Sequence, residues 1–216
     1  MSKSFVERVK CPSCGAEHEV TIWQSINTQM HPEMKEKVLT DEAFLVTCPQ
    51  CGGKGLMDYD FLYHQMEDGV MIQYAAKDHV AQYEKTMDQV KMLGSKEGAY
   101  PGTLRIVSTR EDLKDKILTF SAGYDDRVME IYKTIIREYI IAEGSYPSKP
   151  EKVYLNIDQN GEKAFIVFME DGEVLKADFD ENAYEVVKKE MEPLFADDQS
   201  YVIDEAWAKA INEEKN

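Results

Sequence analysis

The chain lacks any long apolar run and is short of positive charge. None of its apolar stretches approaches the roughly 18 residues that a helix needs to cross a bilayer, which excludes an integral membrane protein. The 216 residues carry 25 Lys plus Arg against 41 Asp plus Glu, a formal charge of -16. Because this excess of negative charge repels phosphate backbones, non-specific nucleic-acid binding is disfavoured.

Several functional signatures are missing as well. The sequence has no Gly-rich phosphate loop, no nucleophile elbow and no zincin helix. The first residues reach the acidic Glu7 before any apolar segment, so no secretory signal is indicated and we expect a cytoplasmic protein.

What is present indicates a globular α+β protein. Apolar residues make up 43% of the chain, and a chain of this length can bury roughly 70% of its unfolded surface. Alternating apolar residues predict strands over 4–10, 19–26, 44–47, 56–61, 70–75, 152–157, 163–169 and 173–179. Helical spacing and capping residues predict helices over 33–39, 78–93, 109–123 and 125–143, and two more that begin after Asp180 and Asp204.

These elements divide the chain into three parts. Residues 1–94 form a β-rich module that resembles a zinc ribbon, and residues 95–144 continue the same domain as central amphipathic helices. Residues 151–216 form a C-terminal α+β domain, a three-stranded antiparallel sheet with helices. This last part carries 7 basic and 18 acidic residues, so most of the negative charge lies there.

The only four cysteines occur in two copies of one pentapeptide. The copies are Cys11-Pro12-Ser13-Cys14-Gly15 and Cys48-Pro49-Gln50-Cys51-Gly52, and 33 residues lie between Cys14 and Cys48. In each copy, two sulfurs three positions apart can face one ion across a tight turn, and the proline fixes φ where no amide is needed. The two amides after proline can point at the first sulfur, and the glycine permits the positive φ that turns the chain away.

Two such turns supply four thiolates, so the sequence predicts one structural Zn²⁺ bound by Cys11, Cys14, Cys48 and Cys51. The alternatives are a thiol or disulfide role, rubredoxin-type iron, and buried inert cysteines. A thioredoxin-like pair is disfavoured because both motifs lead into glycine and strand-like sequence instead of a helix.

Other polar residues have simpler explanations than a site. His18 lies four positions past Cys14 and could replace one sulfur, but an ordinary strand histidine is favoured because four cysteines are available. His31, His64 and His79 have no spacing partner and are expected in surface roles. Residues 158–161 resemble the start of a calcium loop, but the glycine comes too early and a hairpin turn is favoured. The pair at 125–126 is expected to cap a helix.

The sequence resembles the CpXC domain family over about residues 5–140. The resemblance rests on the two Cys-Pro-x-Cys motifs, on Trp23-Gln24-Ser25-Ile26-Asn27 between them, on Leu62-Tyr63-His64, and on the stretches that begin at Thr109-Arg110 and at Gly123-Tyr124-Asp125-Asp126-Arg127. It implies paired metal-binding knuckles with a helical continuation. The family's function is unknown, so no catalytic residue is implied.

The leading hypothesis is a zinc-stabilised protein-interaction or regulatory module. We expect protein partners, with basic ones facing the acidic residues 151–216. The alternatives are a thiol- or metal-dependent enzyme, which needs an accessible cysteine of low pKa, and a nucleic-acid-binding zinc ribbon. Nucleic-acid binding is disfavoured because the sequence has no sustained basic patch: only Lys3, Arg8 and Lys10 cluster near the first cysteine motif.

Overall fold

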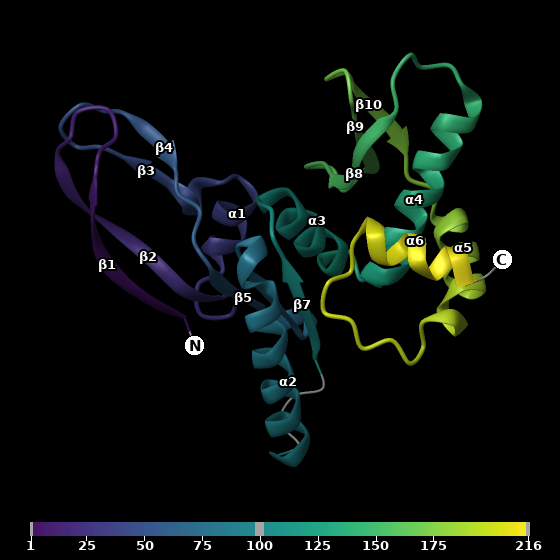
Figure 1. Cartoon of the computed structure of the whole chain (residues 1–216), viewed down its shortest axis with the longest axis horizontal. Coiled ribbons are helices and arrows are strands. Elements are labelled where there is room, and N and C mark those ends of the chain that lie inside the picture. Colours follow the sequence, from purple (N-terminus) through teal and green to yellow (C-terminus); the bar gives the residue numbers. More distant parts are fainter. Residues whose placement is uncertain (1, 98–101, 215–216) are drawn as a thin grey trace. The chain divides into compact units, whose positions relative to one another are not determined.

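The chain folds into two compact units. The computed structural model describes residues 2–97 and 102–214, whose helices and strands are drawn in Figure 1. The units are Met1–Lys114 and Asp115–Asn216, and the division falls inside helix α3 (Arg110–Ser121). Both combine strands and helices, which confirms the predicted α+β class. The three-part division at residues 94 and 151 stays a prediction.

The first unit is built on a mixed five-stranded sheet in the order β1-β2-β5-β6-β7. Its strands are β1 (Lys3–Lys10), β2 (Glu17–Asn27), β5 (Phe61–Gln65), β6 (Val70–Tyr74) and β7 (Thr103–Val107). β1 and β2 are antiparallel, as the short Cys11 turn between them requires, whereas β2 runs parallel to β5 and β6 runs parallel to β7. A parallel pair needs a long crossover, and α2 (Val80–Glu97) supplies it between β6 and β7.

A second hairpin and a short helix complete this unit. The hairpin pairs β3 (Leu45–Thr47) with β4 (Lys54–Leu56) as a separate two-stranded sheet. Helix α1 (Glu33–Leu39) follows Pro32, whose φ of -61° already suits a helix, and it buries Met34 and Val38. The antiparallel hairpin of β1 with β2 and the hairpin of β3 with β4 carry the two cysteine motifs at their turns.

Three details of the sequence prediction for this unit are wrong. No strand is predicted at β7, because its buried run Leu104 to Val107 lacks the alternation of a half-buried strand. The predicted strand over 56–61 falls in the connection from β4 to β5, where Asp58 and Asp60 accept hydrogen bonds from the Tyr74 hydroxyl and the Ala76 amide. Helix α2 continues past Gly94, since one glycine opposes a helix by only about 1 kcal/mol.

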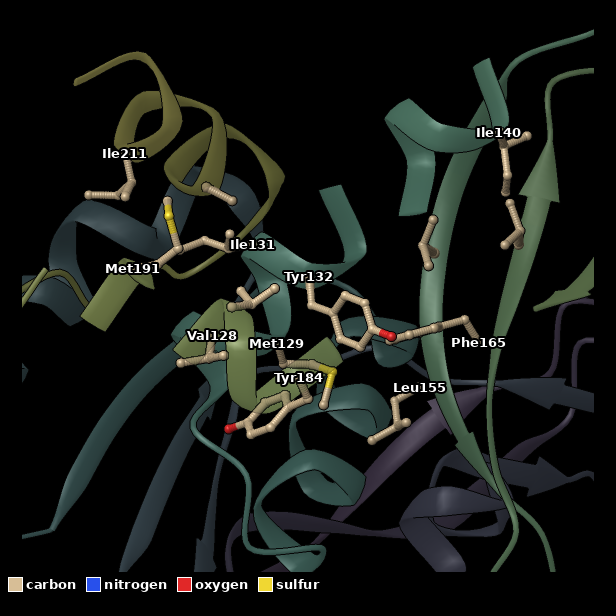
Figure 2. Packing of buried hydrophobic residues seen from close by; sticks show 14 of the residues in the cluster. Val128, Met129, Ile131, Tyr132, Ile140, Leu155, Phe165, Tyr184, Met191 and Ile211 are labelled. Carbon is tan, nitrogen blue, oxygen red and sulfur yellow. The ribbon is translucent and has the colours of Figure 1, made fainter. Parts of the chain in front are cut away.

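The second unit packs helices on a three-stranded antiparallel sheet, as predicted. The sheet order is β10-β9-β8, with β8 (Pro150–Ile157), β9 (Lys163–Met169) and β10 (Val174–Asp178). The helices are α4 (Asp126–Glu143), α5 (Glu181–Met191) and α6 (Glu205–Glu214). Figure 2 shows buried side chains of α4 and α5 meeting in one core. In this core the ring of Tyr132 packs edge-on against that of Phe165 in β9, with the ring centroids 5.1 Å apart.

Capping residues set the limits of these helices. Asp125 accepts a hydrogen bond from the Arg127 amide at the start of α4, and Asp180 accepts from two amides of α5. Gly144 ends α4 with a φ of 65°. In the part of the chain that the structure describes, no helix has both the length and the apolar character needed to cross a membrane.

Candidate metal centre

The four cysteines meet at the tips of the two hairpins. Cys11 follows β1 and Cys48 follows β3, so each pentapeptide turns one hairpin (Figure 1). The four sulfur atoms all lie within 4.8 Å of one another. Cys11 Sγ lies 3.7 Å from Cys51 Sγ, and Cys14 Sγ lies 3.7 Å from Cys48 Sγ. The fold therefore brings together the four residues that the sequence singles out.

The spacing of the sulfurs fits a shared metal ion. A tetrahedral centre with metal–sulfur bonds of about 2.3 Å places its sulfurs about 3.8 Å apart, close to the two separations of 3.7 Å. A disulfide needs about 2.05 Å, and all four thiols are free. This four-sulfur group could hold a metal ion of the kind that prefers soft thiolate ligands.

The two turns share one backbone geometry. The Gly15 amide donates to the Cys11 carbonyl at 2.9 Å, and the Gly52 amide donates to the Cys48 carbonyl at 2.9 Å. Both glycines have a positive φ, 74° at Gly15 and 71° at Gly52, as the motif predicts. The turns are therefore preformed by backbone hydrogen bonds, and each presents one buried and one exposed cysteine, Cys11 and Cys48 being the buried ones.

The local electrostatics of the first turn distinguish its two thiols. Hydrogen bonds from the Cys14 and Ser13 amides lower the pKa of Cys11 to about 6, which is the second-shell role predicted for the amides that follow Pro12. At Cys14 the Ala16 amide acts to lower the pKa, but burial and the neighbouring thiols together raise it to about 12.

This distribution disfavours thiol catalysis. A reactive cysteine needs a low pKa and an accessible sulfur in the same residue. Cys11 has the low pKa but is 5% exposed, whereas the exposed Cys14 has a raised pKa. The burial of Cys11 and Cys48 suits metal ligands better than accessible nucleophiles.

One residue of the centre is absent from the sequence prediction. A Cβ atom at Gly53 would lie 3.3 Å from Cys51 Sγ and 3.5 Å from Ser13 Oγ, so a larger residue would have to displace these side chains by a few tenths of an ångström where the two turns meet. The signal in the sequence is the second glycine after Cys51, which the first pentapeptide lacks because Ala16 stands there.

The histidines lie outside this group. Among the described residues, the cluster of potential ligands holds the four cysteines and does not include His18. His31 Nδ1 lies 3.3 Å from Glu33 Oε1, and His79 Nδ1 lies 2.6 Å from Asp60 Oδ2, so both have the hydrogen-bonded surface roles expected of them.

The two acidic candidates also have structural roles. Asp158 accepts hydrogen bonds from the Asn160 and Glu162 amides, which makes residues 158–161 a turn between β8 and β9 as predicted. Asp125 is the predicted cap of α4. Asp126, however, is buried and lies 3.0 Å from Lys116 Nζ, an ion pair that the sequence does not predict.

Comparison with known protein families shows whether the chain belongs to the family that its cysteine motifs resemble. The profile described as CpXC protein matches residues 9–133, more than half of the chain. The chain belongs to the CpXC family. The match begins in the last residues of β1 and spans both cysteine turns of this CpXC protein, strands β2 to β7, helix α3 and the first part of α4. Comparisons with curated proteins and with solved structures found no match.

Proposed function

We propose that the N-terminal unit of this CpXC protein is a protein-interaction module held in shape by one zinc ion. The ion is bound by Cys11, Cys14, Cys48 and Cys51. The observation that carries the proposal is the set of four sulfurs within 4.8 Å of one another, two pairs of which lie 3.7 Å apart, close to the separation in a tetrahedral metal–sulfur centre. Four thiolates complete the coordination of Zn²⁺, so no position remains for a substrate and the ion serves as a scaffold.

The exposure of the first hairpin supports this scaffolding role. Seven of the eight residues of β1 are exposed and none is buried, so the hairpin of β1 and β2 has little apolar core near its tip. A metal ion that links the turn between β1 and β2 to the turn between β3 and β4 would stabilise the two tips in place of apolar packing. Structural zinc contributes about 10 kcal/mol or more to the folding of small domains, which is enough to decide whether the two tips remain together.

The proposal also covers the cellular compartment of the protein and the class of its partner. Thiols that must stay reduced to bind a metal suit the cytoplasm. Residues 151–216 carry 18 acidic and 7 basic residues, and a surface of that charge favours a basic protein partner over nucleic acid. The domain ranges 1–94, 95–144 and 151–216 belong to the same proposal.

The chain offers a direct test because it has one tryptophan in each unit. Trp23 lies in β2 of the first unit and Trp207 lies in α6 of the second. In Trp207→Phe protein the remaining tryptophan reports the first unit, and in Trp23→Phe protein it reports the second. We expect removal of zinc with a strong chelator to lower the unfolding midpoint seen by Trp23 by at least 10 °C and to leave that seen by Trp207 within a few degrees.

Variants of the second turn provide the control. Cys48→Ser should abolish the chelator's effect on the Trp23 transition, whereas Gln50→Ser, at the exposed variable position of the same pentapeptide, should preserve it. A Trp23 transition that stays unchanged after complete removal of the metal would refute the proposal.

A further inference from the structure

One end of the five-stranded sheet is open to another strand. β1 is the outermost strand in the order β1-β2-β5-β6-β7, and Figure 1 shows it at the rim of the first unit. Seven of its eight residues are exposed and none is buried, so solvent reaches both of its faces and its outer side. β7, at the other end of the sheet, has four of its five residues buried and is covered by the surrounding chain.

Two hydrogen bonds show which backbone groups of β1 face outward. The Cys11 amide donates to the Ala16 carbonyl at 2.9 Å, so the amides of the odd-numbered residues of β1 point toward β2. The Trp23 amide, opposite Ser4, points away from β1 to the Tyr59 hydroxyl, as this alternation requires. In the described part of the chain, the outward backbone groups of β1 have no partner in a neighbouring strand. They belong to Ser4, Val6, Arg8 and Lys10.

The side chains of β1 select the kind of strand that can pair there. Lys3, Phe5 and Glu7 lie on one face of the sheet, because successive residues of a strand alternate between faces. Phe5 is 40% exposed. Within residues 2–97 and 102–214, neither Lys3 nor Glu7 forms an ion pair, and the two stand symmetrically before and after Phe5. Opposite charges placed symmetrically about an aromatic residue are complementary to an antiparallel copy of the same strand.

A register centred on Phe5 satisfies backbone and side chains together. The Phe5 rings of two copies then face each other, and Lys3 of each copy faces Glu7 of the other, so the ion pair occurs twice by symmetry. Ser4 of each copy faces Val6 of the other, and both residues direct their backbone groups outward, so each such pair exchanges two hydrogen bonds. Phe5 occupies the non-hydrogen-bonded rung, where opposite side chains approach most closely.

The neighbouring registers lose this match. Because opposite side chains of two paired strands share a face, the two-fold axis passes through a residue and never between two. An axis at Glu7 places two carboxylates opposite each other, and like charges in that position are destabilising. An axis at Val6 places Lys3 opposite Val9, and opposite charges no longer meet. The sequence of β1 therefore favours the axis at Phe5.

We propose that the chain forms a homodimer in which the β1 strands of two copies pair antiparallel about Phe5. The two five-stranded sheets become one continuous sheet. The contact uses the same surface of both copies and consumes both open edges, so association stops at two. Because the contact is small, we expect a dissociation constant of about 10 to 100 µM. The inference goes beyond the zinc scaffold, since every residue of the contact precedes Cys11.

The test is sedimentation equilibrium of the full-length chain from about 5 to 500 µM, where the wild type should pass from monomer to dimer. Val6→Pro removes an amide that the pairing uses and should raise the dissociation constant at least tenfold. Val6→Thr keeps this amide and should stay within threefold of the wild type. Proline is tolerated on an edge strand where the amide faces solvent, so the Val6→Pro monomer should keep its fold.

Charge reversal tests the register without changing the backbone. Lys3→Glu and Glu7→Lys each place two like-charge pairs across the axis and should weaken the dimer about tenfold at low salt. The double variant restores opposite charges and should recover the wild-type affinity within threefold. Lys10→Glu is the control, because it changes the net charge as Lys3→Glu does but lies beyond the paired residues, and it should leave the affinity within threefold.

Three results would overturn the proposal. They are a wild type that stays monomeric over the whole range, a dimer that Val6→Pro does not weaken, and a double charge variant that associates no more tightly than the single ones. An edge that binds a strand of a different protein gives the first result. Circular dichroism checks the fold of each variant, and if Val6→Pro does not fold, the charge variants decide.

Discussion

Lys116 Nζ lies 3.0 Å from Asp126 Oδ2, and the two residues are 2% and 1% exposed. Lys116 also contacts Glu130, which contacts Lys133, and Lys133 in turn contacts Asp115. These five residues of α3 and α4 form a buried ionic cluster with a net charge of -1. Asp115 extends it to β8 by accepting a hydrogen bond from the Leu155 amide at 2.6 Å.

Loss of one cation from this cluster should be costly. Lys116→Met leaves Asp126 and Glu130 facing each other without their shared partner, and an uncompensated buried charge costs about 3 to 5 kcal/mol. The measurement is the free energy of unfolding in urea. Lys209→Met is the matched control, because Lys209 pairs with Glu205 while 53% of its side chain is exposed, and such a pair contributes less than about 1 kcal/mol. Equal losses in the two variants would contradict the account.

A pH effect is expected at the start of α2. The hydrogen bond from His79 Nδ1 to Asp60 Oδ2 raises the pKa of His79 above its ordinary value. The stabilisation from this pair is therefore complete below the unfolded pKa of about 6.5 and is lost as the pH rises through the folded pKa. An NMR titration should place the His79 midpoint above about 6.5, and Asp60→Asn should lower it. A midpoint unaffected by that substitution would show that Asp60 is not the cause.

The contact between the two cysteine turns predicts a difference between two neighbouring glycines. Gly53→Ala adds a methyl group 3.3 Å from Cys51 Sγ, whereas Gly55→Ala adds one in open space. Neither glycine has a positive φ, so the comparison isolates the contact. Zinc should pass to a competing chelator several-fold faster from Gly53→Ala than from Gly55→Ala. Equal rates would mean that the turns do not pack as described.

Most of the fold could be predicted because its signals are local. The residues of the two pentapeptides predict the turns that they form, and the capping residues Asp125 and Asp180 predict the starts of α4 and α5. β7 could not be found in this way, since its only pattern is burial by β6 and by the surrounding core. The end of α2 was misplaced because a single glycine opposes a helix only weakly.

In the site, too, the residues with local sequence signals could be predicted and the others could not. The four cysteines could be identified from spacing alone, because their geometry is fixed by residues adjacent in sequence. Gly53 and Asp126 could not, because each matters through a residue distant in the sequence, Ser13 in the first case and Lys116 in the second.

The central claim, one zinc ion bound by four sulfurs, is tested most directly by metal analysis combined with X-ray absorption at the zinc edge on untagged protein. The account predicts one equivalent of zinc per chain with four sulfur neighbours at about 2.3 Å. Less than about a tenth of an equivalent of any metal, or a shell that contains nitrogen or oxygen ligands, would contradict it.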